Sequence, residues 1–228
     1  MGAIPGRAAD PEKQEEQESF RQRELEPRLA EAREGKRVML FMDAAHFVHG
    51  AFLGMVWCFV RMFIPSPSGR KRFNVLGVLN AVSKEVITLT NETYINAESV
   101  CQLLLQVVQY YGSKPITIVL DNARYQRCAF VQSFAVDLGI ELLFLPSYSP
   151  QLNLIERYWR FLRNKCLYSK FYPDFAQFKR AIQRCITFAP YEYGDELETW
   201  MAWNFQSFQN VTFSPFNEYN NSKYSMED

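Results

Sequence analysis

The sequence predicts an α/β domain in which a mixed β-sheet is flanked by helices. Its 228 residues are 48% apolar, which is enough to bury a full core. Apolar runs of strand length lie close together in the first part of the chain, which favours antiparallel pairing. Later runs alternate with helical segments, the pattern that joins parallel strands through crossover helices.

The expected strands are short apolar runs bounded by turn residues. They lie at 37–47, 54–60, 73–82, 85–90, 115–121 and 140–146. A basic, turn-rich loop is expected at 65–72. The short connection between 73–82 and 85–90 predicts a hairpin.

The expected helices carry apolar residues three or four positions apart, which places them on one face. These helices lie at 97–111, 123–139, 154–167 and 174–188. Asn96 is the expected N-cap of the first helix, and Gly139 is expected to end the second.

The N-terminal segment is dominated by charge. Residues 12–37 contain eight Glu and seven Lys or Arg but few apolar residues. This composition predicts a solvated helix or linker, or an arm that docks on a partner subunit. We therefore divide the chain into a charged N-terminal segment (1–36), a globular domain (37–205) and a polar C-terminal tail (206–228).

The cysteines and apolar runs predict the compartment. Five cysteines are dispersed without a C-x-x-C pair, so we expect reduced thiols rather than disulfides or a zinc site. No secretory signal is visible, and the apolar run 51–60 is too short to cross a bilayer before Arg61 ends it. We expect a cytoplasmic protein that does not contact a membrane.

Three acidic residues occupy comparable positions. Asp43 follows the apolar run "VMLFM", Asp121 follows "ITIVL", and Glu156 lies in the first turn of an expected helix. Strand ends and helix N-termini border the same crevice in α/β sheets. If the two strands are neighbours, the carboxylates converge. Taken singly, each acid also suits a turn, a cap or the helix dipole.

Converging carboxylates repel one another unless a cation lies between them. Oxygen ligands without a nearby Cys or His set suit Mg²⁺ or Mn²⁺. Two such ions, ~4 Å apart, can bind the attacking and leaving oxygens of a phosphodiester. Asp43, Asp121 and Glu156 are therefore the candidate catalytic and metal-binding residues.

The motifs around these acids resemble the DDE transposases of the mariner superfamily, in particular its bacterial insertion-sequence branch. "LDNARYQ" matches the segment that carries the second Asp, and "LPSYSPQLNLIERYWRFLRNK" matches the segment that carries the Glu. The 34 residues between Asp121 and Glu156 are the typical spacing of this branch. "MDAAHF" resembles the first motif, and the likeness covers about residues 37–190.

The resemblance implies a ribonuclease-H-like catalytic domain at 37–205, two Mg²⁺ (or Mn²⁺) ions, and DNA strand cleavage and strand transfer without a covalent protein–DNA intermediate. It also implies a homodimer when transposon ends are paired. Family members carry helix-turn-helix domains before the catalytic domain, and residues 1–36 do not resemble one. Two alternatives stay open: another ribonuclease-H-like nuclease, or an inactive relic that binds DNA or a partner.

Neighbouring polar residues are candidates for accessory roles. His46 could donate a proton or form an ordinary hydrogen bond near the site. Asn122 could orient a phosphate or serve a turn, and Asn153 is a plausible N-cap. Tyr148 could stack on a base, although packing is the expected role. Trp159, together with Phe161, is expected to pack rather than stack on bases.

Basic residues gather around the candidate site. There is no Asp or Glu from 44 to 84, and Asp174 is the only acid from 157 to 184. Such patches could bind DNA phosphates, although a solvated helix face explains the second one equally well. The candidate nucleic-acid contacts are Arg70, Lys71, Arg72, Arg157, Arg160, Arg163 and Lys165.

Overall fold

The computed structural model describes residues 11–50 and 71–202. The strands are β1 (Val38–Val48), β2 (Arg72–Asn80), β3 (Val86–Asn91), β4 (Ile116–Leu120) and β5 (Ile140–Phe144). The helices are α1 (Pro11–Phe20), α2 (Glu26–Arg33), α3 (Ala97–Tyr111), α4 (Ala129–Asp137), α5 (Leu154–Cys166), α6 (Phe175–Glu192) and α7 (Gly194–Trp200). A π-helical turn, Arg21–Leu25, joins α1 to α2, and a 3₁₀ turn, Pro150–Leu152, precedes α5.

The five strands form one mixed sheet in the order β3-β2-β1-β4-β5. The β1–β2 and β2–β3 pairs are antiparallel, and the β1–β4 and β4–β5 pairs are parallel. The predicted mixed sheet and the predicted hairpin are thereby confirmed. The strand expected at 54–60 lies outside the described residues.

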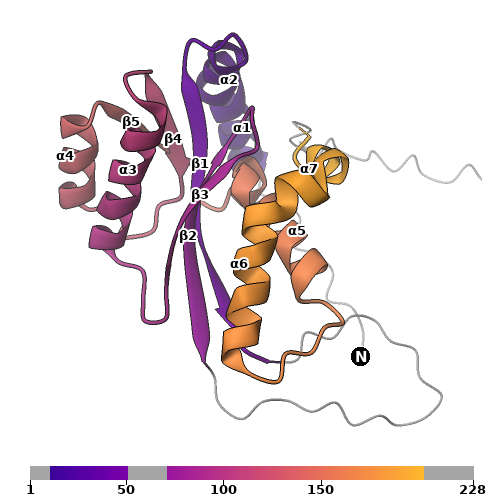
Figure 1. Cartoon of the computed structure of the whole chain (residues 1–228). Helices are drawn as coiled ribbons and strands as arrows, with labels where there is room; N and C mark the ends of the chain where they lie inside the picture. The colour runs from indigo at the N-terminus through magenta and orange to yellow at the C-terminus, as the bar shows by residue number, and fades with distance from the viewer. Residues whose placement is uncertain (1–10, 51–70, 203–228) are drawn as a thin grey trace, which may run out of the picture.

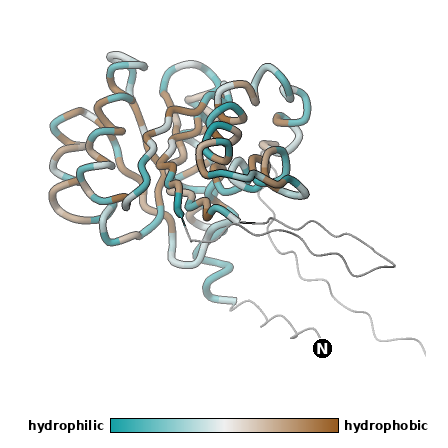
Figure 2. The backbone as a smooth tube through the Cα atoms, turned by 60° about the horizontal axis from the view of Figure 1, so that its bottom comes forward, coloured by the Kyte–Doolittle hydropathy of each residue, from teal (hydrophilic) through white to brown (hydrophobic). Residues whose placement is uncertain are grey.

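Helices cover both faces of the sheet (Figure 1). One core layer packs α3 and α4 against the sheet, and the other packs α2, α5, α6 and α7 against the opposite face. Successive side chains of β1 alternate between these layers: Phe41 points to the α5 layer and Met42 to the α3 layer. The most hydrophobic parts of the chain run along the strands and the helix faces that meet them (Figure 2).

Local signals place several element boundaries correctly. α3 has the predicted bounds, and the side chain of Asn96 accepts a hydrogen bond from the Ser99 amide at 2.9 Å, as an N-cap does. Gly139 adopts a φ of +69° immediately after α4, as expected for a helix stop. α4 itself begins only at Ala129, six residues later than predicted, because turns and bends occupy 124–128.

The charged N-terminal segment is an integral part of the fold, so the expectation of a solvated helix or linker is wrong for its second half. Leu25 and Leu29 are 0% and 4% exposed and belong to the α5 core layer. Phe20, Leu25 and Leu29 stand among many charged residues in the sequence. This signal was too weak to predict that Leu25 and Leu29 are buried.

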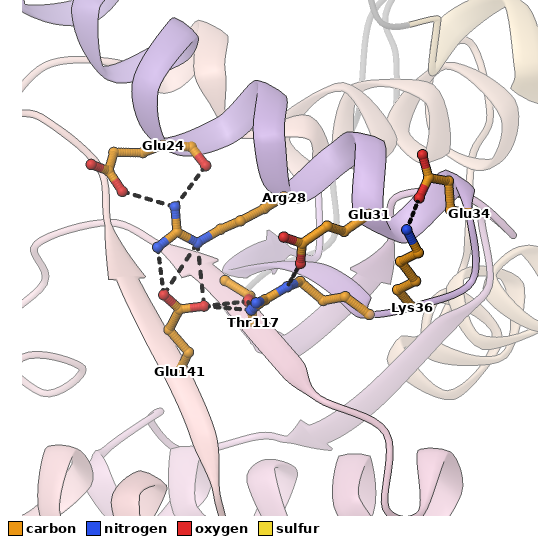
Figure 3. Close-up of polar contacts among 8 residues, drawn as sticks. Glu24, Arg28, Glu31, Glu34, Lys36, Thr117 and Glu141 are labelled. Atoms are coloured by element: carbon orange, nitrogen blue, oxygen red, sulfur yellow. Dashed lines mark hydrogen bonds and ion pairs between the residues drawn. The ribbon is translucent and has the colours of Figure 1, made fainter.

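A polar network fastens α2 to the sheet (Figure 3). Glu141 of β5 accepts hydrogen bonds from Arg28 Nη2 and Arg37 Nη1, both at 2.6 Å. Thr117 Oγ1, on the paired strand β4, donates to the same carboxylate at 2.6 Å. Arg28 also bonds Glu24 at 2.8 Å. The segment before β1 is therefore attached through both apolar and charged contacts.

No helix in the described part of the chain is long and apolar enough to cross a membrane.

Candidate active site

Parallel pairing brings Asp43 and Asp121 to one edge of the sheet. The last aligned residues of β1 and β4 are Phe41 and Val119, both of which face the α5 layer. Asp43 and Asp121 each follow two positions later. Because side chains alternate along a strand, both carboxylates project toward the same layer. The predicted neighbouring strands are thus observed.

Glu156 reaches the same region from a helix. α5 begins at Leu154, so Glu156 lies in its first turn. Glu156 and Asp121 both line a cavity of about 350 Å³, whose remaining wall comes from Asn122, Ala123, 145–150 and Asn153. The sheet edge and the start of α5 therefore form a hollow that carries two of the three predicted acids.

Asp43 is electrostatically coupled to the other two acids. Burial raises the pKa of Asp43 to about 7, and the negative charges of Glu156 and Asp121 act in the same direction. The backbone N–H of Ala44 and the indole N–H of Trp159 oppose this rise, the indole by donating to Asp43 Oδ2 at 3.1 Å. Without a cation, these carboxylates repel one another.

The donor set suits a hard divalent ion, since carboxylate oxygens are the ligands that Mg²⁺ and Mn²⁺ prefer. The side chains that could bind such an ion are, however, widely spaced. Within residues 11–50 and 71–202, no three acidic, His or Cys side chains lie close enough to hold a metal together. The structure thus gathers Asp43, Asp121 and Glu156 in one region without completing a coordination sphere.

Asn153 does not cap α5 as expected. Its side chain makes no capping hydrogen bond. Instead Nδ2 donates to the backbone oxygen of Met42 at 3.2 Å, and the buried Oδ1 has no hydrogen-bond partner. The residue therefore ties the start of α5 to β1, one position before Asp43.

Two other accessory candidates have structural roles. Asn122 Nδ2 donates to Leu145 O at 2.6 Å and so joins the ends of β4 and β5. His46 lies three positions beyond Asp43, on the other face of β1, and its Nδ1 lies 2.7 Å from Asn74 Oδ1. The ordinary hydrogen bond considered for His46 is thus observed, and its role as an accessory proton donor stays a prediction.

Tyr148 is exposed, so the expectation that it packs is wrong. Its side chain is 83% exposed at the cavity wall, and its φ of +59° lies in the left-handed region. The ammonium of Lys13 lies 5.1 Å from its ring centroid. By contrast, Trp159 and Phe161 are 1% and 0% exposed, which confirms the packing predicted for them.

The basic candidates divide into two groups. Arg160 is exposed and Arg163 is half-buried, and both follow Glu156 on the same helix face at i+4 and i+7. Arg157 donates to Ala202 O at 2.6 Å, and Lys165 pairs with Glu196 at 2.5 Å. Within α5, Arg160 and Arg163 stay candidate phosphate contacts, and the Arg163 guanidinium lies 5.5 Å from the Phe47 ring centroid.

Near the N-terminus of β2, Arg72 is exposed, and the Lys71 ammonium lies 5.7 Å from the Phe175 ring centroid. Arg70 lies outside the described residues.

Sequence reasoning missed Tyr125. Burial raises the pKa of its phenol to about 12, and the negative charges of Asp43 and Asp121 contribute to the rise. The phenol is therefore protonated and lies within electrostatic reach of both acids. The available signal in the sequence was its position four residues after Asp121, within the segment "LDNARYQ".

The mixed sheet, with carboxylates at the end of β4 and at the start of α5, is the arrangement of an endonuclease domain. A family model described as DDE superfamily endonuclease matches residues 60–179, and the chain belongs to this family. Asp43 precedes the matched segment, while Asp121 and Glu156 lie inside it. No curated protein sequence matches the chain.

Solved structures of Mos1 transposase share the fold. The Mos1 paired-end complex with the left transposon end aligns over 89% of this chain and 65% of its own, at 14% identity and a TM-score of 0.59. The Mos1 strand transfer complex aligns over 92% and 66%, at 14% identity and a TM-score of 0.58. The chain thus spans about two thirds of these proteins, and its sheet has the predicted ribonuclease-H-like fold.

Proposed function

We propose that this chain is the catalytic domain of a DNA transposase that cuts and rejoins DNA strands with Mg²⁺ or Mn²⁺. One observation carries the proposal. Asp43 and Asp121 lie two residues beyond the last aligned β1–β4 pair, and Glu156 lies across the cavity that Asp121 also lines. Three carboxylates from three elements, within one nuclease family, favour this chemistry over three unrelated turn and cap residues.

The acidic residues would divide the work. Asp43 and Asp121 would bind metal jointly, and Glu156 would complete one coordination shell. When bound, two ions would supply positive charge to the attacking and leaving oxygens of a phosphodiester. Arg160 and Arg163, on the Glu156 face of α5, would hold the DNA phosphates in place. The related Mos1 has been solved as a paired-end complex with Mg, which supports the same ion class here.

DNA and a second copy of the chain are the proposed partners. The Mos1 structures are described as paired-end and strand transfer complexes. By analogy, this chain would act on transposon ends and target DNA, with two copies pairing the ends. We retain residues 37–205 as the catalytic domain, with α2 attached to it.

A supercoiled plasmid and a duplex with a free 3′-hydroxyl test the reaction. We expect Mn²⁺-dependent nicking of the plasmid and joining of the duplex to it. Asp121→Asn and Glu156→Gln should abolish both reactions without lowering the melting temperature, while Asp137→Asn, at an exposed position of α4, should leave both reactions intact. Full activity in either active-site variant would contradict the assignment.

The same assay separates the alternatives. Nicking without joining would favour a simple ribonuclease-H-like nuclease. A titration in which the wild-type protein binds no Mn²⁺ would favour the inactive relic.

A further inference from the structure

A buried tryptophan holds one of the proposed metal ligands. Trp159 Nε1 donates a hydrogen bond to Asp43 Oδ2 at 3.1 Å, and Trp159 is only 1% exposed. Trp159 lies three positions after Glu156 on α5. One helix therefore carries a proposed metal ligand and, about one turn later, the donor that contacts another.

A glycine on β2 makes room for the indole. Gly77 is paired with Asp43 in the β1–β2 register. A Cβ at Gly77 would lie 2.8 Å from Cη2 of Trp159 and 3.1 Å from its Cζ2, distances too short for van der Waals contact. The Phe47 ring packs against the indole edge-on, with the centroids 6.5 Å apart. The indole is thus confined where its N–H meets Asp43.

A second tie lies on the other side of Glu156. Asn153, three positions before it, donates to Met42 O at 3.2 Å. The first turns of α5 therefore bond β1 at two points, at Met42 and at the Asp43 side chain. These two hydrogen bonds fix the position of Asp43 relative to Glu156.

We propose that Trp159 is a positioning residue for the reaction, seated by Gly77, that orients the Asp43 carboxylate for metal binding. The inference rests on the proposed function. A carboxylate can rotate about its terminal bond, where the torsional wells are broad. A hydrogen bond to Oδ2 selects one orientation and directs Oδ1 away from the indole. Partners of this kind typically contribute 10–100-fold to metal affinity or activity.

The competing explanation is that Trp159 only fills the core and that its buried N–H needs an acceptor. Two substitutions separate the explanations. Trp159→Phe removes the N–H together with the ring atoms nearest Gly77. Adding Gly77→Ala puts a methyl group into the space that the smaller ring leaves. The double variant should therefore recover packing without recovering the hydrogen bond.

The experiment measures melting temperature, Mn²⁺ affinity by calorimetry, and kcat and the Mn²⁺ dependence of plasmid nicking. We expect Trp159→Phe to lower the melting temperature and to weaken Mn²⁺ binding about 10–100-fold. The double variant should regain melting temperature, and its Mn²⁺ affinity should stay weak. Recovery of Mn²⁺ affinity along with melting temperature would overturn the positioning role.

A packing control covers the case in which the double variant stays unstable. Phe178→Leu, in the same core layer but on α6, removes buried volume without touching the indole N–H. It should lower the melting temperature and leave Mn²⁺ affinity unchanged. Equal weakening of Mn²⁺ binding in this control and in Trp159→Phe would overturn the proposal. Absence of Mn²⁺ binding in the wild-type protein would instead overturn the proposed function itself.

Discussion

Gln17 of α1 donates a hydrogen bond from Nε2 to the backbone oxygen of Tyr148, 131 positions away in the sequence. Gln151 Nε2 in turn donates to Gln17 Oε1 at 2.5 Å. Both partners of Gln17 lie on the connection between β5 and α5, and Tyr148 lines the candidate cavity. The N-terminal helix thus contacts the loop that leads into the Glu156 helix.

Gln17→Ala is therefore expected to reduce activity with little loss of stability. The two hydrogen bonds lie near the surface, and such bonds typically contribute about 0.5–1.5 kcal/mol each to stability. We expect plasmid nicking to slow about fivefold, which corresponds to about 1 kcal/mol. Gln22→Ala, which removes a side chain bonded within the N-terminal segment, is the matched control. Equal rates for the two variants would show that the loop does not depend on α1.

Leu25→Ala should destabilise the whole domain. Leu25 is fully buried in the α5 core layer, and truncation of such a residue typically costs about 2–5 kcal/mol. Urea unfolding measures the change in the free energy of unfolding. Val136→Ala, at a position that is 74% exposed on α4, should change it by less than about 0.5 kcal/mol. A change as small as that for Leu25→Ala would mean that the packing of the π-helical turn against the domain contributes little to stability.

The network around Glu141 should make stability depend on acidity. Hydrogen bonding from Arg28, supported by Thr117 and by the charges of both arginines, lowers the pKa of Glu141 to about 2. Its pKa in the unfolded chain is about 4.3. The folded form is therefore favoured above the unfolded-state pKa, and this advantage is lost as the pH falls toward 2.

Glu141→Gln tests this dependence. The variant should lose less stability than the wild type between pH 5 and pH 2, measured by urea unfolding. Glu15→Gln, at an exposed position of α1, should follow the wild-type curve. Parallel curves for wild type and Glu141→Gln would argue against the network.

Asp43→Asn should stabilise the metal-free protein at high pH. Burial raises the folded-state pKa of Asp43 to about 7, above the unfolded value of about 3.9. The protonated carboxyl favours folding, so this contribution is complete below pH 4 and is lost as the pH rises through 7. At pH 8 in EDTA the variant should be more stable by up to about 4 kcal/mol.

Melting curves from pH 5 to 8 in EDTA provide the measurement, with Asp137→Asn as control. The difference in melting temperature between Asp43→Asn and the wild type should shrink when Mg²⁺ replaces EDTA. A cation bound to the wild-type carboxylates relieves the same repulsion that the substitution removes. The melting temperature of the metal-free wild type should fall as the pH rises from 5 to 8. A constant melting temperature over this range would contradict the burial of a charged Asp43.

Arg160→Gln and Arg163→Gln should weaken DNA binding by a salt-dependent amount. DNA affinity falls as salt rises, and each lost phosphate contact makes the plot of log affinity against log salt less steep by about 1. Lys165→Gln should have a smaller effect, because Lys165 already pairs with Glu196. Fluorescence anisotropy with a labelled duplex at several salt concentrations measures the slopes. Three equal slopes would contradict this ranking.

Elements with strong local signals were predictable. The bounds of α3, its Asn96 cap and the β2–β3 hairpin follow from apolar spacing and turn residues within a few positions. The late start of α4 was missed because the Asp121 side chain accepts from the Ala123 amide at 2.9 Å, which favours a turn there. The different faces of Asp43 and His46 could have been read from strand alternation.

The sequence by itself determined the order of strands and helices and identified Asp43, Asp121 and Glu156 as the acids of interest, because periodicity, flanks and spacing are local properties. Only the tertiary structure decided that Leu25 is buried, that Tyr148 is exposed and that Trp159 donates to Asp43. The physical reason is that these contacts join segments far apart in the chain. Which side chains meet therefore depends on how the helices pack against the sheet. Gly77 is an example, because its missing side chain makes room for Trp159.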